Sequence, residues 1–335
     1  MKNIFLELQN LSIGYQQNNS SKIIRQNIDL QATTGELIAL IGTNGAGKST
    51  LLRTIVNLQK PLSGKIFIKN NNLNNYTTSK LSEIISFVST EIIEAPELKV
   101  FDLVALGRFP YTNWFGKLSE SDNSMISNSL QAVGMTNFRQ KYISQLSDGE
   151  RQRVMIARTL AQNTPMIVLD EPTAFLDLNN KYEIVNLLHT LAKQFHKTII
   201  FSTHDINIAI READKIWLML DNETIQGAPE DLILQEKFQL IFSEKNIFFD
   251  NESGDFRSKK HFYQNVQLSA FNNNTKLWTR RALERAGYNI VDSCPKLHIC
   301  QTMLENKIVW QIMNHNFFSI YDLINFLNIN KKEIS

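Results

Sequence analysis

The chain has 335 residues, of which 43% are apolar and 20% are charged, as expected for a globular protein with room for two domains. A formal net charge of +2 and the absence of a long Lys–Arg block give no reason to expect a nucleic-acid partner. The longest apolar runs, such as residues 216–220, fall far short of the ~20 residues that cross a bilayer, and the N-terminus does not resemble a secretory leader.

The first third of the chain is predicted to contain several strands. Apolar residues alternate over residues 4–9, which indicates a half-buried strand, and a second strand is predicted at 23–30. A fully apolar run at 37–41 indicates a buried strand, and further strands are predicted at 64–68 and 84–88. The asparagine clusters at 70–75 and 272–274 are predicted to be loop tips.

Residues 42–49 read GTNGAGKS and follow the buried strand directly. The pattern G-x-x-x-x-G-K-[ST] between a strand and a helix is typical of a loop whose backbone N–H groups surround a phosphate chain. The lysine would reach the β- and γ-phosphates, and the serine hydroxyl would ligate Mg²⁺. The predicted nucleotide-binding residues of this segment are Gly42, Thr43, Asn44, Gly45, Ala46, Gly47, Lys48, Ser49 and Thr50.

Helical spacing dominates residues 97–162, which predicts a helical insert. Within it, Ser147 and Glu150 have the spacing of a capping box at the start of a helix that runs to Ala161. That structural role is a complete explanation by itself. The functional alternative is that Ser147, Gly149 and the helix dipole form a second anion site, which would be useful only if another subunit brought a γ-phosphate to it.

The apolar run 166–169 predicts a second buried strand, and Asp170 and Glu171 follow it. Asp170 would hold Mg²⁺, because a hard cation prefers oxygen ligands. Glu171 would orient or deprotonate the attacking water, a contribution typically worth ~10²–10⁴-fold in rate. His204 follows another apolar strand, 198–203, which we expect to lie beside 166–170, so that its imidazole would sense the γ-phosphate or the water.

The remainder of the chain is predicted to form a small α/β module over residues 251–335. A helix is predicted over 278–286, strands at 288–291 and 307–312, and a last helix around 320–327. The sequence Trp278-Thr279-Arg280-Arg281 either contacts a nucleotide or partner or lies on an amphipathic surface helix, and the surface helix is the simpler explanation. Cys294 and Cys300 are expected to be reduced thiols.

Together these elements predict an α/β protein with a P-loop core and a largely parallel sheet, an antiparallel N-terminal β subdomain, a helical insert at about 97–162, and two domains at 1–250 and 251–335. Residues 1 to about 245 closely resemble the nucleotide-binding subunit of ATP-binding-cassette transporters. GTNGAGKS matches the phosphate loop of that family, IVLDEPT its acidic strand, and FSTHD its switch histidine. LSDGE stands where the family usually has LSGGQ, and Tyr15 falls where the family stacks an aromatic ring on adenine, although a tyrosine in an early strand can equally be part of a core.

This resemblance implies a head-to-tail homodimer that holds Mg²⁺ and ATP between the phosphate loop of one subunit and Ser147, Gly149 and Glu150 of the other. LVALGRFP at 103–110 and LAQNTP at 160–165 are similar to subunits of iron-siderophore, haem and cobalamin importers. The implied protein is an ATP hydrolase at the cytoplasmic face of the cell membrane, peripheral to separate permease subunits and served indirectly by a substrate-binding protein. Soluble ABC ATPases of translation or DNA repair, and exporter subunits, are the alternatives.

Three departures from the family pattern stand out. Thr90 occupies about the position of a family glutamine that ligates Mg²⁺ and contacts the permease, and either Thr90 or Glu91 would have to replace it. Asp148 replaces a glycine, and we expect its carboxylate to point away from the phosphate, because repulsion at ~4 Å amounts to ~4 kcal/mol at an effective dielectric of 20. The segment 251–335 shows no resemblance on which a role could be based.

Overall fold

The computed structural model describes residues 3–17, 20–89, 97–112, 116–242, 247–250, 254–292, 297–304 and 307–330. The chain divides into two compact units. The N-terminal unit is Met1–Ser243 with Phe249–Asp255, and the C-terminal unit is Glu244–Phe248 with Phe256–Ser335. A short two-stranded sheet, β11 (Ile247–Asp250) and β12 (Asp255–Ser258), lies in the chain where the two units meet in sequence.

A six-stranded sheet in the order β10-β9-β3-β8-β7-β6 forms the centre of the N-terminal unit. Its neighbouring strands are parallel except for β10, which runs antiparallel to β9. This confirms the predicted largely parallel sheet. The strands are β3 (Leu37–Gly42), β6 (Ile85–Val88), β7 (Met166–Leu169), β8 (Thr198–Ser202), β9 (Lys215–Met219) and β10 (Thr224–Gly227).

An antiparallel sheet in the order β2-β1-β4-β5 forms the second layer of this unit. Its strands are β1 (Ile4–Gln17), β2 (Ser20–Thr33), β4 (Ser63–Ile68) and β5 (Asn71–Asn72). Helix α1 (Lys48–Ile55) contributes Leu51, Leu52 and Ile55 to a core cluster that also holds side chains of both sheets. The helix that follows the glycine-rich loop is therefore fixed from two sides.

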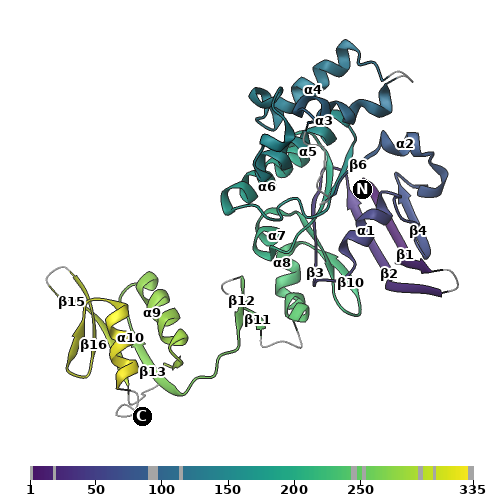
Figure 1. Cartoon of the computed structure of the whole chain (residues 1–335). Helices are drawn as coiled ribbons and strands as arrows, with labels where there is room; N and C mark the ends of the chain where they lie inside the picture. Colours follow the sequence, from purple (N-terminus) through teal and green to yellow (C-terminus); the bar gives the residue numbers. More distant parts are fainter. Residues whose placement is uncertain are drawn as a thin grey trace. The chain divides into compact units, whose positions relative to one another are not determined.

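Helices α3, α4 and α5 gather at one end of the N-terminal unit, away from β1 and β2 (Figure 1). The helices of this unit are α2 (Thr78–Ser82), α3 (Val100–Ala105), α4 (Glu120–Ala132), α5 (Asp148–Gln162), α6 (Leu178–Gln194), α7 (Ile206–Glu212) and α8 (Pro229–Leu234). A 3-10 segment, Leu106–Tyr111, follows α3. The stretch 97–162, where a helical insert is predicted, contains α3, this 3-10 segment, α4 and α5.

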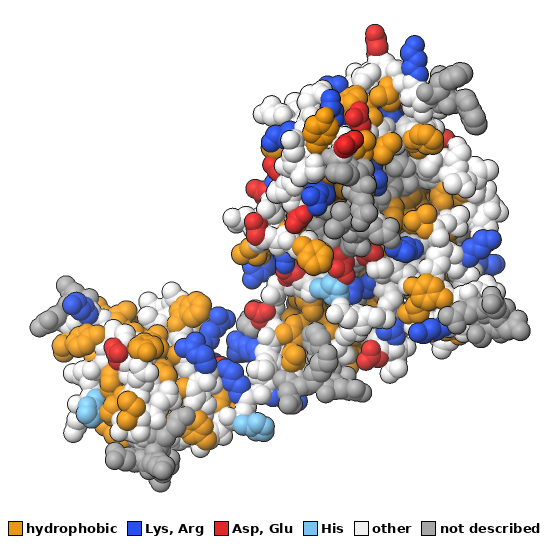
Figure 2. All heavy atoms as spheres, in the orientation of Figure 1, with side chains coloured by type: hydrophobic (Ala, Val, Ile, Leu, Met, Phe, Trp, Pro, Cys, Tyr) orange, Lys and Arg blue, Asp and Glu red, His pale blue; other side chains and the backbone are white. Residues whose placement is uncertain are grey.

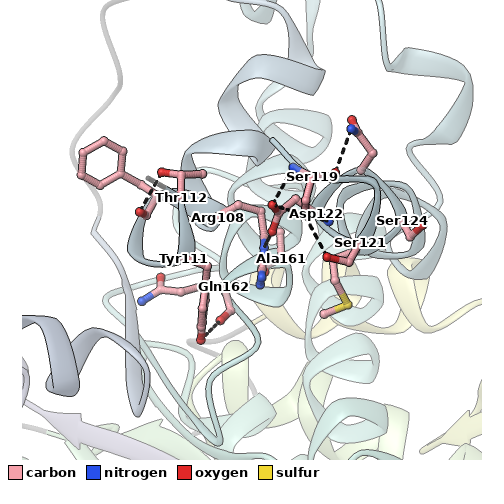
Figure 3. A network of polar contacts seen from close by, with 12 residues as sticks. Arg108, Tyr111, Thr112, Ser119, Ser121, Asp122, Ser124, Ala161 and Gln162 are labelled. Carbon is pink, nitrogen blue, oxygen red and sulfur yellow. Dashed lines mark hydrogen bonds and ion pairs between the residues drawn. The ribbon is translucent and has the colours of Figure 1, made fainter. Parts of the chain in front are cut away.

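A buried ion pair joins the 3-10 segment to α4 and α5 (Figure 3). Arg108 Nε donates to Asp122 Oδ1 at 2.7 Å, and Arg108 Nη1 donates to the Ala161 carbonyl at 2.8 Å. Ser119, the N-cap of α4, donates to Asp122 Oδ2 from its hydroxyl at 2.6 Å and from its backbone N–H at 2.9 Å. The hydroxyl and N–H of Ser119, followed by the Arg108 guanidinium, lower the pKa of Asp122 to about 2. The pair therefore stays ionised although both side chains are buried.

The C-terminal unit is a five-stranded sheet in the order β14-β13-β15-β16-β17 with two helices packed on one face. Its elements are β13 (Gln264–Ser269), α9 (Asn273–Arg285), β14 (Tyr288–Ile290), β15 (His298–Leu304), β16 (Lys307–Ile312), β17 (His315–Phe317) and α10 (Ile320–Ile329). The core includes Leu283 of α9 and Leu323 and Leu327 of α10. The expected α/β character of this segment is confirmed.

The expectation that the asparagine clusters are loop tips is wrong in part. The Asn272 side chain accepts a hydrogen bond from the Asn274 N–H, so the cluster at 272–274 caps and begins α9, five residues before the predicted start. Asn72 ends β5 and caps the 3-10 turn Leu73–Asn75 in the same way. Asparagine is favoured at both loop tips and N-caps, because its short side chain bonds nearby backbone N–H groups.

Within the described residues, no helix combines the length and apolar character needed to span a bilayer.

Candidate nucleotide-binding and catalytic site

The glycine-rich loop connects buried strand β3 to helix α1. Gly45 and Gly47 have φ values of 81° and 100°, which L side chains rarely adopt. A Cβ on Gly47 would lie 2.7 Å from Ile24 Cγ2, so the loop is also packed too closely for a side chain there. Helix α1 begins at Lys48 with no side-chain N-cap. Its first N–H groups and its positive dipole end are therefore available to an anion.

Lys48 is buried beneath this loop and points back into it. Its Nζ donates to the Gly42 carbonyl at 3.0 Å and to the Thr43 carbonyl at 3.3 Å. Burial lowers the pKa of Lys48, while the carboxylates of Glu171 and Asp170 act in the opposite direction. The arrangement places a desolvated cation beside two anions, which is the charge distribution expected where phosphates and a divalent cation meet.

The two acidic residues that follow β7 are linked by a hydroxyl from the neighbouring strand, which contacts the carboxylate of Asp170 and the backbone of Glu171. β7 and β8 lie side by side, as the sequence predicted, and they are parallel with Leu169 paired to Phe201. Buried Ser202 donates to Asp170 Oδ1 at 2.7 Å and accepts from the Glu171 backbone N–H at 2.8 Å. Glu171 has a positive φ of 47°, so its backbone turns sharply at this point. Ser202 therefore orients both acidic residues, a role that was missed from the sequence.

His204 lies within hydrogen-bonding distance of Glu171. Its Nε2 is 2.6 Å from Glu171 Oε1, and both side chains are partly exposed. Near the middle of the N-terminal unit, acidic and histidine side chains lie close together on the face shown in Figure 2. The structure thus places Lys48, Asp170, Glu171 and His204 at one edge of the parallel sheet, at the carboxyl ends of β3, β7 and β8. Ligands of open α/β sheets bind at this edge.

Ser147 is the N-cap of α5, and the predicted capping box is present. Its hydroxyl accepts from the Glu150 N–H at 3.3 Å, and Glu150 Oε2 accepts from the Ser147 N–H at 2.8 Å. The Ser147 backbone N–H, followed by the Ser147 hydroxyl that donates to Glu150 Oε2 at 2.9 Å, lowers the pKa of Glu150. Asp148 pairs with Arg151 one turn along the helix at 3.1 Å. The extra carboxylate of this segment is therefore held by a neighbouring cation.

Gly149 is fixed by a neighbour from the following helix. A Cβ on Gly149 would lie 2.9 Å from atoms of the Asn180 side chain in the first turn of α6. Asn180 in turn donates to the side chain of Asp177, the N-cap of α6, from its N–H at 2.8 Å and from Nδ2 at 3.1 Å. A side chain at position 149 would therefore displace Asn180 from its place beside Asp177.

Tyr15 is half exposed, and its hydroxyl lies 3.4 Å from Thr50 Oγ1, one residue beyond the GTNGAGKS segment. It lines a cavity of about 520 Å³ between α1, β6 and α5, together with Arg53, Leu58, Gln59, Phe87, Ser89 and Arg158. It is therefore no part of the closed core. Thr90 and Glu91, considered above as replacements for the family glutamine, lie outside the described residues.

Oxygen donors suited to a hard cation are present at the sheet edge, namely the exposed hydroxyl of Ser49 and the buried carboxylate of Asp170. Among the described residues, no group of three or more His, Cys, Asp or Glu side chains forms an all-protein metal site. With the oxygens of Ser49 and Asp170, a cation here would take its remaining ligands from a bound phosphate chain and water, as Mg²⁺ commonly does.

Two stretches of the chain match known protein families. The "ABC transporter" model matches residues 25–174, and the "Iron ABC transporter C-terminal domain" model matches residues 263–328, where the sequence had suggested no resemblance. The chain is 39% identical over 236 residues to the achromobactin transport ATP-binding protein CbrD of Dickeya dadantii, covering 70% of this chain and 86% of the relative. It is 30% identical to the ferric enterobactin transport ATP-binding protein FepC of Escherichia coli, covering 72% and 89%.

Solved structures agree with this result. The dimeric structure of the bacterial cassette MJ0796 matches with a TM-score of 0.59 and 31% identity, covering 67% of this chain and 98% of that one. The same cassette in a post-hydrolysis state bound to ADP and Pi matches with a TM-score of 0.59 and 30% identity, over the same shares of the two chains.

Proposed function

Because the chain belongs to the ABC transporter ATP-binding family, whose members are ATPases, we propose that it is the ATPase subunit of an importer for iron-siderophore complexes. The relatives named for achromobactin, petrobactin, ferric enterobactin and iron-hydroxamate transport support the siderophore rather than the haem or cobalamin expectation. The match of residues 263–328 to an iron-transporter family points the same way. Within this proposal, residues 1–250 form the ATPase domain and 251–335 an accessory module.

The observation that supports ATP hydrolysis best is the convergence of Lys48, Asp170, Glu171 and His204 at one sheet edge. The loop from Gly42 to Thr50 would hold the phosphates, with Lys48 on the β- and γ-phosphates. Mg²⁺ would be held by Ser49 and Asp170 and would neutralise charge on the phosphate oxygens. Glu171 would accept the proton of the attacking water. His204, whose Nε2 lies 2.6 Å from Glu171 Oε1, would hold the γ-phosphate or the water in line.

Adenine would stack on Tyr15. The ring is half exposed and its hydroxyl reaches Thr50, which places an aromatic face beside the phosphate loop. Stacking on a base contributes ~1–3 kcal/mol where it has been measured by alanine substitution. Tyr15→Phe should therefore retain ATP affinity, whereas Tyr15→Ala should weaken it about tenfold or more.

The complete site would need a second copy of the chain. Ser147, Gly149 and Glu150 belong to the start of a 15-residue helix, whose dipole favours an anion. We propose that this segment meets the γ-phosphate bound by the partner copy in a head-to-tail homodimer. The matched cassette whose structure is dimeric supports this arrangement.

The permease would dock at the cavity between α1, β6 and α5. Leu58 and Phe87 offer apolar surface there, Arg53 and Arg158 offer cations, and the wall includes Ser89, the residue before Thr90. A segment of an integral-membrane permease that inserts here would reach the part of the chain expected to contact both Mg²⁺ and the transporter. This would hold the subunit at the cytoplasmic face of the membrane, where a separate binding protein would act only indirectly.

Uptake of a radioactive iron-siderophore complex by cells that lack this chain tests the proposal. The wild-type chain and Glu230→Gln, a matched change at an exposed position of α8, should restore uptake. Glu171→Gln should not restore it. Leu58→Glu should bind ATP normally but no longer co-purify with an integral-membrane protein. Uptake that does not depend on the chain, export instead of import, or recovery with ribosomes or DNA rather than membranes would contradict the proposal.

A further inference from the structure

Strand β2 contacts the phosphate loop through the side chain of Arg25. Arg25, paired in register with Ile13 of β1, donates from Nε to the Ala46 carbonyl at 3.1 Å. Its Nη1 donates to the carbonyl of Asp221, just after β9. One guanidinium therefore connects the antiparallel layer, the phosphate loop and the end of a strand of the parallel sheet.

The Ala46 carbonyl belongs to the peptide that precedes Gly47. In a trans peptide, the C=O and the following N–H point in opposite directions. A guanidinium that holds the Ala46 oxygen toward β2 therefore directs the Gly47 N–H toward the opposite side, where the phosphates would lie. The hydrogen bond also polarises this peptide and makes its N–H a better donor.

Two further contacts fix the same peptide. Ala46 is almost fully buried, and its N–H donates to the Thr43 carbonyl at 3.1 Å, which closes a turn within the loop. Gly47 lies directly against Ile24, the neighbour of Arg25 on β2. Because Gly47 is otherwise free to adopt many backbone conformations, a charged donor on the preceding carbonyl has a strong influence on which one is populated.

We propose that Arg25 is a positioning residue for nucleotide binding, which acts through the Ala46–Gly47 peptide to pre-orient a phosphate-binding N–H group. It does not touch the nucleotide itself. The prediction specific to this role is that losing Arg25 weakens the binding of ATP and ADP, whose terminal phosphates the loop would hold, far more than the binding of AMP. If Arg25 had a purely structural role in the β-layer, its loss would lower the stability of the protein and weaken the binding of all adenine nucleotides alike.

The test compares the affinities of the full-length protein for ATP, ADP and AMP by competition against a fluorescent ATP analogue. Arg25→Gln should weaken the binding of ATP and ADP about tenfold, the size expected for one charged hydrogen bond. The same variant should weaken the binding of AMP less than twofold. Arg25→Lys, which keeps the charge and one donor, should recover part of the loss. Lys22→Gln removes a cation from the same strand at an exposed position and should change nothing.

The measured ratio of ATP to AMP affinity decides the matter. A ratio that falls several-fold in Arg25→Gln, with a smaller fall in Arg25→Lys, supports the proposal. Equal weakening of ATP and AMP, or unchanged ATP binding, overturns it. If Arg25→Gln cannot be purified folded, the ratio in Arg25→Lys alone decides, because that variant retains the cation that β2 contributes.

Discussion

Removing the guanidinium of Arg108 should destabilise the N-terminal unit strongly. In Arg108→Met the buried carboxylate of Asp122 would lose its cation, while the side-chain volume would be roughly kept. Breaking a buried pair by removing one partner costs about 3–5 kcal/mol. For a unit of this size each 1 kcal/mol lowers the melting temperature by roughly 2–4 °C, so we expect a fall of roughly 6–20 °C. Scanning calorimetry of the full chain measures this, with the N-terminal transition identified by its shift on adding ATP.

Two further variants give this prediction a sharp control. Arg108→Met with Asp122→Leu removes both charges, and the double variant should be less destabilised than the sum of the single variants. Lys80→Met breaks an exposed pair with Glu83 and should leave the melting temperature nearly unchanged. Additive effects of the two buried changes, or an Arg108→Met effect as small as that of Lys80→Met, would refute the reasoning.

Four other outcomes follow, three from the site and one from the buried ion pair. Glu171→Gln should bind ATP and accumulate as a dimer by size-exclusion chromatography, and wild-type turnover in this variant would remove Glu171 from its role. Lys48→Ala should weaken ATP binding measured by calorimetry, and unchanged affinity would contradict the loop assignment. Ser202→Ala should raise the Mg²⁺ concentration for half-maximal turnover roughly tenfold or more, because Asp170 loses its orienting hydroxyl; an unchanged Mg²⁺ dependence would argue against this. Because the pKa of Asp122 is lowered from 3.8 to about 2, its stabilising effect is present above pH 3.8 and lost as the pH falls through 2. The gap in melting temperature between wild type and Asp122→Asn should shrink over that range, and a constant gap would exclude this linkage.

The phosphate loop and the acidic strand could be predicted from the sequence because their chemistry is local. GTNGAGKS specifies its own backbone, and four buried residues before Asp170 are enough to indicate a strand end. The capping box at Ser147 was predictable for the same reason, since its two partners are three residues apart. Parallel pairing of β7 with β8 also followed from two similar apolar runs.

Features that depend on distant partners were not predictable in this way. Ser202 acts on Asp170 and Glu171 from another strand, although one signal was present: a polar residue at the end of an apolar strand beside the acidic one. β1 extends to Gln17 rather than residue 9, because a register shift between Leu8 and Leu11 breaks the alternation that marks a strand. A bulge of this kind changes the period without ending the pairing.

The 2.6 Å contact between His204 and Glu171 has a consequence for energy use at rest. The imidazole occupies a carboxylate oxygen that an attacking water would otherwise reach. In a subunit without nucleotide this contact would persist. It would be broken when the terminal phosphate of a bound nucleotide competes for the ring. Glu171 would thus be freed to act only after a nucleotide with a terminal phosphate is in place.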